Sequence, residues 1–402
     1  MTFFRKIFLT LTMILTFVVA GKVKADDFPE FIVLPDYVTT PDGMVVCPKT
    51  GDLLVACPNF GDISKPSCVI RINKAGEVSK WFDVPVLAET GVAHPMGIDL
   101  GPDGSVYLCD NQNWPTGNGE TGELNQGRLL RLKIDQGKVV STTVIAQGIS
   151  HPNGVKIKDG FAYVTVSCLP KIKYHEDFCK NPDCRNIRES SDEFEFLLSA
   201  VYRFPVDAEN IQVTNTLADE NIYAVFPTFN KDCQYGADGI VFDNEGNLYI
   251  GNFGDGVILK VVGNTDAGSR FMTVVPFAES QPIPPLNLEN GTVDPDFLPK
   301  ATRIAMRTVD GICHDPETGC FYVADFSNNA VARVSADGKS ISFFAQSPDN
   351  DGLHGELNQP GEPCIWNGRL AVTCFDMVCD PDKVNTRHDP KATIVFLPLN
   401  TK

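Results

Sequence analysis

The chain has 402 residues, with 51 acidic and 34 basic side chains and a formal charge of −17. This acidic balance argues against binding to nucleic acid or to anionic lipid, because both need clustered Lys and Arg. The hydrophobic fraction of 43% is that of a globular chain and excludes a largely disordered one.

The first 25 residues have the pattern of a secretory signal peptide. Two basic residues precede the apolar stretch 7–20, and residues 23–25 offer a small-x-small cleavage site. The apolar stretch is short for a membrane span, and an uncleaved N-terminal anchor is the alternative. We therefore predict a protein that is secreted or periplasmic, with a single mature domain over 26–402 and no membrane span after cleavage.

Six segments of the mature chain share one pattern. In each, a polar or sulfur-containing residue precedes Gly or Pro, an apolar strand follows, and a turn leads to a second apolar strand. The residues that precede the Gly or Pro are Asp42, Met96, Asn153, Asp238, Asp310 and Glu362. Four short strands with their turns fill about 40 to 50 residues, which is the size of one propeller blade.

The remaining strands complete this picture. Third and fourth strands are visible at 128–134 and 139–145, and again at 257–262 and 270–277. The sequence therefore predicts an all-β fold, a six-bladed β-propeller, because six such units can close a ring that protects the sheet edges. By analogy with other propellers, we expect a last strand at 393–397 to pair with 31–34 and join the two ends.

Two insertions interrupt the repeats. Residues 168–198 are charged and contain cysteine, and residues 278–300 are rich in proline. Loops of this length are usually functional or disordered, and surface decoration is the alternative interpretation.

Thirteen cysteines in an exported chain predict disulfides. Local bridges are expected within the group Cys168, Cys179 and Cys184, and across a hairpin between Cys313 and Cys320. Zinc is the rival interpretation, but no paired Cys-x-x-Cys with matching His spacing appears. Simple burial is the better interpretation for several cysteines in strand-like runs.

The six positions before the Gly or Pro are expected to ring one mouth of the central channel, since the first strand of a blade is innermost. Five carry oxygen donors and four of these are carboxylates, which repel one another unless a cation or a proton compensates. The predicted metal ligands are Asp42, Asn153, Asp238, Asp310 and Glu362. Ca²⁺ is the simplest ion for such a set, another divalent metal being possible. The structural alternative is that Asp-Gly and Asn-Gly are common turn dipeptides.

The ends of the second strands should line the same mouth, because the two strands are antiparallel. They carry Asp110, Asn111, Asn252 and Asp325, which we predict to bind substrate. Trp114 and Phe253 add apolar walls, so the pattern indicates an acidic pocket with aromatic edges.

This pattern resembles the gluconolactonase/regucalcin family of calcium-dependent six-bladed propellers. Gly361-Glu362-Pro363 looks like the family's glutamate ligand, and Asn153 in Pro152-Asn153-Gly154-Val155 like its asparagine ligand. Asp238 in Ala237-Asp238-Gly239-Ile240 looks like the family's aspartate, both ligand and proposed base. The family's other asparagine falls at Met96, and His94 stands where an arginine often precedes it by two residues.

The resemblance implies a Ca²⁺-dependent hydrolase of the lactonase or esterase type, acting on a small-molecule lactone or related ester. The cation would polarise the carbonyl, Asp238 would activate water, and His94 would contact substrate. Asp42 and Asp310 are expected to supply the oxygen that Met96 lacks. The alternative is a non-enzymatic propeller, braced by calcium, that binds a small molecule, glycan or protein on its top face.

Overall fold

The computed structural model describes residues 28–112, 125–169, 197–230, 235–263, 269–279, 286–287, 292–293, 305–375 and 391–399. The predicted signal peptide, Trp114, Cys179, Cys184 and most of the two insertions lie outside these residues. Over the described ranges, no helix is both long and apolar enough to cross a membrane.

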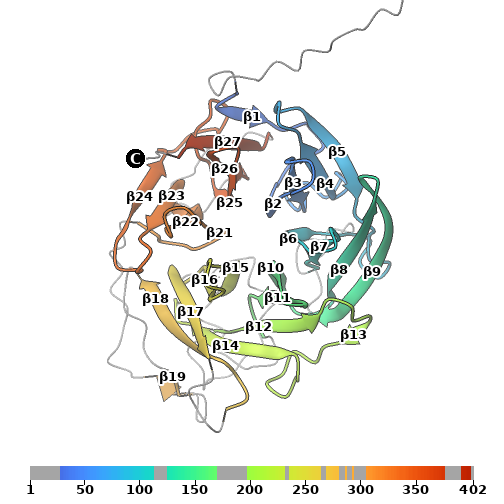
Figure 1. Cartoon of the computed structure of the whole chain (residues 1–402), viewed down its shortest axis with the longest axis vertical. Helices are drawn as coiled ribbons and strands as arrows, with labels where there is room; N and C mark the ends of the chain where they lie inside the picture. The colour runs from blue at the N-terminus through green and yellow to red at the C-terminus, as the bar shows by residue number, and fades with distance from the viewer. Residues whose placement is uncertain are drawn as a thin grey trace, which may run out of the picture.

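Six blades, each with four antiparallel strands, follow one another around a central axis, which confirms the predicted all-β six-bladed propeller (Figure 1). Blade 1 consists of β2 (Met44–Val46), β3 (Leu53–Cys57), β4 (Cys68–Ile72) and β5 (Val78–Asp83). Blade 2 consists of β6 (Pro95–Leu100), β7 (Val106–Asp110), β8 (Gly127–Asp135) and β9 (Lys138–Ile149). Blade 3 consists of β10 (Pro152–Lys158), β11 (Phe161–Val166), β12 (Leu197–Pro205) and β14 (Ile222–Thr228).

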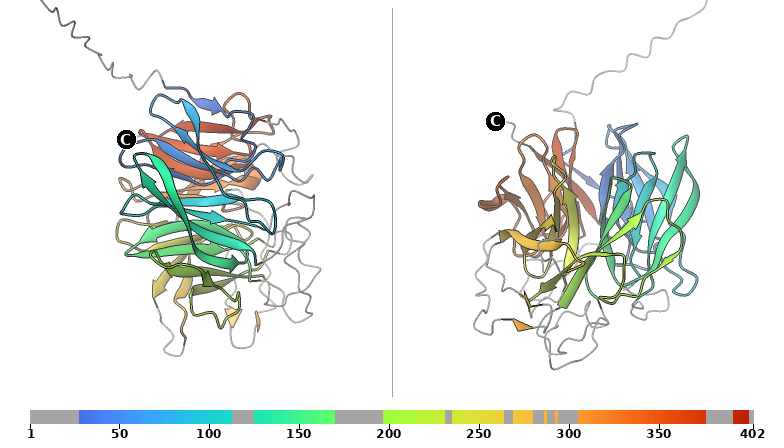
Figure 2. Two further views of the ribbon diagram at one scale, coloured as in Figure 1. Left: turned by 90° about the vertical axis from the view of Figure 1, so that its right-hand side faces the viewer. Right: turned by 60° about the horizontal axis from the view of Figure 1, so that its bottom comes forward.

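Blade 4 consists of β15 (Ala237–Phe242), β16 (Leu248–Asn252), β17 (Val257–Gly263) and β18 (Thr273–Glu279). Blade 5 consists of β21 (Ile312–His314), β22 (Phe321–Asp325), β23 (Ala330–Val334) and β24 (Ile341–Gln346), with a 3₁₀ turn, η4 (Phe326–Asn328), after β22. Blade 6 consists of β25 (Pro360–Trp366), β26 (Arg369–Cys374), β27 (Thr393–Pro398) and β1 (Phe31–Val33). The edge-on view on the left of Figure 2 shows strands that run between the two faces of the disc.

Three short strands lie outside this plan. β13 (Ile211–Gln212), from the connection between β12 and β14, pairs in parallel with β9 and extends the sheet of blade 2. β19 (Leu286–Asn287) and β20 (Thr292–Val293) form a separate two-stranded sheet.

The N-terminal strand closes the ring, as predicted. β1 pairs antiparallel with β27, with Phe31 opposite Val395. Just before β1, the Phe28 ring packs edge-on against Trp366 and Phe396, with ring centroids 5.5 and 5.0 Å away. The last blade is thus built from both ends of the described chain, and its outer edge is the first strand in sequence.

The hydrophobic core is divided among the interfaces between neighbouring blades. Each sheet is covered on both faces, so inner strands such as β3 are buried along their whole length. Between blades 2 and 3, for example, Tyr202 and Phe204 are fully buried and their rings lie nearly parallel, with centroids 5.6 Å apart. Burial on both faces explains why these strands are continuous apolar runs in the sequence.

The prediction of a bridge between Cys313 and Cys320 is wrong. Both are free thiols, and no disulfide joins two of the described cysteines. Cys313 lies opposite Tyr322 in the β21–β22 ladder, two residues beyond Cys320. The Cys320 sulfur instead accepts a hydrogen bond from Arg333 Nη2 at 3.3 Å. Proximity across a turn did not place the two sulfur atoms together.

Candidate functional site

The start of the first strand is irregular at the same point in four blades. The ladder between first and second strands skips residues between Pro95 and Ile98, Pro152 and Val155, Ala237 and Ile240, and Pro360 and Pro363. The skipped residues include Met96, Asn153, Asp238 and Glu362. A β-bulge redirects side chains relative to a regular strand. The repeated motif of the sequence is therefore a bulge at the axis and not a hairpin turn.

The glycines of this motif let the first strands of neighbouring blades approach closely. A Cβ on Gly97 would lie 2.5 Å from the Asn153 carbonyl oxygen, and a Cβ on Gly239 would lie 2.5 Å from that of Asp310. The Gly239 N–H donates to this Asp310 oxygen at 3.2 Å. Because the backbones meet here, the side chains just before the glycines are gathered near the axis.

A small cavity lies among these strand starts. Its volume of about 20 Å³ is enough for one water molecule or one ion. It is lined by all five residues predicted as metal ligands, Asp42, Asn153, Asp238, Asp310 and Glu362. Four of them are buried and Glu362 is half-buried. Met96 does not line the cavity and belongs to the hydrophobic cluster between blades 2 and 3.

The four carboxyl groups cannot all ionise in this environment without a compensating charge. Burial raises the pKa of Asp42 to about 7 and that of Glu362 to about 8. Burial and repulsion from the neighbouring acids raise the pKa values of Asp238 and Asp310 well above the usual range, and these two carboxyls are hydrogen-bonded to each other. Protons or a cation must therefore accompany the cluster.

One atom of the cluster indicates that a cation fits. Asp42 Oδ2 is buried and has no hydrogen-bond partner. Carboxylate and amide oxygens are the donors that Ca²⁺ prefers. In the described part of the chain, no three or more His, Cys, Asp and Glu side chains could hold a metal ion as they are placed. The acids share a cavity with suitable donor chemistry but do not form a complete coordination site.

A lysine that was not among the predicted site residues also lines this cavity. Lys156 lines it, and its Nζ lies 4.0 Å from Asp99 Oδ1. Burial alone would lower the pKa of this lysine, but the charges of Asp99 and Glu362 raise it, so the ammonium persists and offsets part of the acidic charge. The sequence contained a signal for this pair, because Asp99 and Lys156 each lie three residues after the repeated position of their blade, Met96 and Asn153.

A polar network at the mouth joins blades 2, 3 and 4. His94 Nδ1 lies 3.1 Å from the Asn111 carbonyl oxygen, and Asn111 Nδ2 lies 3.3 Å from His151 Nδ1. His151 Nε2 lies 2.7 Å from the Tyr235 hydroxyl, which also accepts a hydrogen bond from Asn153 Nδ2 at 3.1 Å. Burial lowers the pKa of His151 to about 3, so its imidazole is neutral. The hydrogen bond to Tyr235 fixes the nitrogen of the Asn153 side-chain amide, so its oxygen is the atom that remains to bind a ligand in the cavity.

The structure thus brings the predicted residues His94 and Asn111 into one network. His151 and Tyr235 were missed. His151 had a signal in the sequence, since His-Pro-x-Gly occurs at both 94–97 and 151–154. Tyr235 carried none that we recognise.

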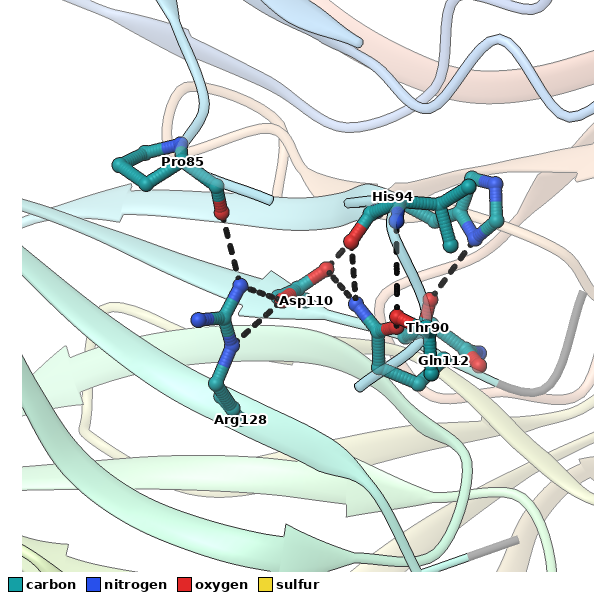
Figure 3. Close-up of polar contacts among 8 residues, drawn as sticks. Pro85, Thr90, His94, Asp110, Gln112 and Arg128 are labelled. Carbon is teal, nitrogen blue, oxygen red and sulfur yellow. Dashed lines mark hydrogen bonds and ion pairs between the residues drawn. The ribbon is translucent and has the colours of Figure 1, made fainter. Parts of the chain in front are cut away.

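Asp110 is used by the scaffold (Figure 3). Its Oδ2 accepts a hydrogen bond from Arg128 Nε at 2.7 Å, and its Oδ1 accepts from the His94 N–H at 2.8 Å and from Gln112 Nε2 at 2.9 Å. Arg128 also donates to the Pro85 carbonyl oxygen. Both carboxylate oxygens are occupied, so this buried ion pair braces the β6–β8 corner of blade 2.

Asp325 and Asn252 are engaged in the same way. Asp325 accepts hydrogen bonds from the backbone N–H groups of Arg307 and Thr308, each at 3.0 Å, and from Asn328 Nδ2 at 2.7 Å. Asn252 Nδ2 donates to the Pro227 carbonyl oxygen at 3.1 Å. These contacts organise the loops of blades 4 and 5, and substrate contact by Asp110, Asn252 or Asp325 stays a prediction.

No family model and no curated protein matches this chain. Solved structures are similar to it: a regucalcin from Agrobacterium tumefaciens, a gluconolactonase from Xanthomonas campestris and a PQQ-bound aldose sugar dehydrogenase from Streptomyces coelicolor. Their identities are 14%, 14% and 15%, with TM-scores of 0.49, 0.46 and 0.48. The matches cover 93%, 92% and 91% of this chain and 98%, 89% and 97% of the other chains.

Structural similarity at 14 or 15% sequence identity does not show which activity this chain has. The architecture is established by the strand pairing itself, which gives six four-stranded blades. The chain is therefore a six-bladed β-propeller, and the solved structures similar to it include a gluconolactonase and a regucalcin, the family that its motifs resemble.

Proposed function

We propose that this protein is a hydrolase of lactones or related esters that depends on a divalent cation, with Ca²⁺ as the cation. The observation that carries the proposal is the cavity in which Asp42, Asp238, Asp310 and Glu362 meet, with Asp42 Oδ2 buried and unpartnered. These acids and Asn153 would hold the ion. When bound, a divalent cation polarises a carbonyl oxygen and stabilises the charge that develops on it.

Asp238 is the base in this proposal. Asp238 lines the cavity, so a water molecule held there would lie beside its carboxylate. Burial and repulsion from the neighbouring acids raise the pKa of this carboxyl, and a bound cation would lower it and keep the carboxylate ionised to act as base. It takes a proton from water while the water oxygen bonds to the carbonyl carbon. The ester C–O bond then breaks and the leaving alkoxide oxygen takes up the proton, so that lactone and water give a hydroxy acid. Lys156 holds positive charge at the cavity wall throughout.

The experiment is turnover of a panel of lactones and aryl esters by the mature chain, in calcium and in EGTA, with calcium binding measured by calorimetry. We expect activity in calcium only. Asp238→Asn should lower kcat by about 10²- to 10⁴-fold, and Glu362→Gln should weaken calcium binding. Asp337→Asn, a control at an exposed acid in a β-turn, should change neither quantity.

Two outcomes would contradict the proposal. Full turnover in EGTA would show that hydrolysis does not depend on a divalent cation. Calcium binding without turnover of any substrate would favour the second candidate, a non-enzymatic propeller that calcium braces. The burial of Met96 in an apolar cluster favours that candidate, because it removes one oxygen donor from the ring around the axis.

We also propose that the protein acts outside the cytoplasm, on the strength of the predicted signal peptide at residues 1–25. The intact mass of the protein purified from its own cells tests this. A chain that begins at Asp26 would support export with cleavage, and one that retains residues 1–25 in the membrane fraction would indicate an anchor.

A further inference from the structure

Six aromatic side chains form an unbroken series beside the acidic cavity. We call this series the aromatic collar, and its members in order are Phe60, Phe375, Phe326, Phe253, Tyr235 and His151. Successive ring centroids lie 5.8, 5.8, 5.8, 5.3 and 4.9 Å apart. The rings come from blades 1, 6, 5, 4, 4 and 3. The series therefore runs through five of the six blades, with Phe60 and Phe253 half-buried and the other four rings buried.

The collar lies at the same end of the channel as the cavity. Phe253, Phe326 and Phe375 directly follow the second strands of their blades. The ends of these strands pair with the starts of the first strands, as Ala237 does with Asn252. Residues that follow a second strand therefore stand at the same end of the blade as the acids at the start of a first strand.

Two contacts join the collar to the predicted ligands. Phe375 packs on Gly361, where a Cβ would lie 2.7 Å from its Cε1, and Gly361 adjoins Glu362. Tyr235 accepts the hydrogen bond of Asn153 through its hydroxyl. A lactone or ester whose carbonyl group reaches the cavity would therefore place its substituents against these rings.

The mouth is also two-sided. Phenyl rings come from blades 4, 5, 6 and 1, where the polar side chains of Asn252 and Asp325 are already hydrogen-bonded to their own loops. Blade 2 and its border with blade 3 present His94, Asn111 and His151. Sugar hydroxyls against the phenyl side would lose hydrogen bonds to water and gain none. An alkyl or aryl group there would instead gain from leaving water.

We propose that the site selects lactones or esters that carry an apolar alkyl or aryl substituent, held on the aromatic collar, in preference to polyhydroxylated sugar lactones. This inference rests on the proposed hydrolase function and adds the substrate class. The collar acts on specificity, and the bonds made and broken are those of ester hydrolysis given above.

The first test compares δ-lactones of one ring size with alkyl substituents of increasing length, and glucono-δ-lactone beside them. We expect kcat/KM to rise by up to about fourfold for each added methylene until the collar is covered. Glucono-δ-lactone should be the poorest substrate. Equal or better turnover of glucono-δ-lactone would overturn the inference.

The second test uses two matched variants. Phe253→Ala removes a half-buried collar ring that packs on Tyr235, and Phe344→Ala removes a half-buried ring that packs on Tyr322 in the outer part of blade 5. We expect Phe253→Ala to lower the ratio of long-chain to unsubstituted lactone turnover by about tenfold, and Phe344→Ala to leave it unchanged. An equal ratio in both variants would contradict the role of the collar.

A binding measurement separates this inference from the proposed function. The probe is the lactam analogue of the long-chain lactone, titrated into wild type and both variants by calorimetry. Binding that weakens only in Phe253→Ala, without hydrolysis of any substrate, would reject the hydrolase and keep the apolar site. No difference among the three proteins would reject the apolar site whatever the turnover.

Discussion

At the scale of single residues, the ionisation of the buried acids controls what the cavity can hold. The raised pKa values of Asp42 and Glu362, about 7 and about 8, mean that these groups bind protons in the folded chain at pH values where they are ionised in the unfolded chain. Between the ordinary pKa of each acid in the unfolded chain and its raised pKa in the folded chain, the native state binds more protons than the unfolded state. The free energy of unfolding therefore falls as the pH rises through this interval. A cation must displace these protons, so its affinity rises over the same interval.

We therefore predict opposite pH effects with and without calcium. In EGTA, the melting temperature should fall as the pH is raised from about 5 to about 8. With saturating calcium the fall should be smaller, and the calcium Kd should decrease with pH. The double variant Asp42→Asn/Glu362→Gln should flatten the EGTA curve, because it removes two of the titrating groups. A wild-type melting temperature that does not depend on pH in EGTA would show that the cluster is not protonated as inferred.

At the scale of elements, the start of each first strand combines close packing with side-chain presentation. The glycine that follows the repeated position of the motif leaves room for the backbone of the next blade. Gly239 does so for Asp310, and Gly97 for Asn153. The bulge beside it turns the preceding side chain out of the regular strand alternation. The acid and the glycine are therefore needed together, and the spacing between blades depends on the glycine.

We predict that Gly239→Ala destabilises the protein by about 1 to 3 kcal/mol, the usual cost of overpacking, and weakens calcium binding. The added methyl would lie 2.5 Å from a backbone oxygen that cannot move without shifting blade 5. Gly61→Ala is the control, since its nearest atom is a Thr40 methyl group at 3.1 Å. Chemical denaturation gives both stabilities, and comparable losses in the two variants would argue against the close-packing role.

At the scale of the whole molecule, stability depends on closure of the ring by β1. This strand covers the edge of β27, and the segment also buries Leu34 and packs the half-buried Phe28 ring against blade 6. An open β27 would expose unpaired backbone groups that attract other chains.

Deletion of residues 26–34 should therefore lower the free energy of unfolding by about 3 kcal/mol or more, the cost of removing one buried leucine such as Leu34. The same deletion should promote self-association. The comparison is a chain that begins at Asp26 and keeps β1, with stability followed by denaturation and association by size-exclusion chromatography. A shortened chain as stable and monomeric as the longer one would show that closure contributes little.

Much of this architecture could be predicted from the sequence because propeller blades are local. Each blade is nearly continuous in the chain, so alternating strands and turns are visible within a short window. The closure of 31–34 on 393–397 followed from completing the ring, and it is present as β1 on β27. The five residues predicted as ligands could be singled out because one pattern recurs in register, and the structure places all of them around one cavity.

The partners of individual side chains could not be predicted, because they come from other blades or from across a turn. Asp110 pairs with Arg128 across the β7–β8 ladder, and Cys313 lies opposite Tyr322 instead of Cys320. The sequence by itself determined the repeats, the ring and the acids at its mouth, since these follow from local periodicity. Only the tertiary structure decided that Lys156 enters the cavity and that six aromatic rings form the collar, because those neighbours meet only where the blades converge.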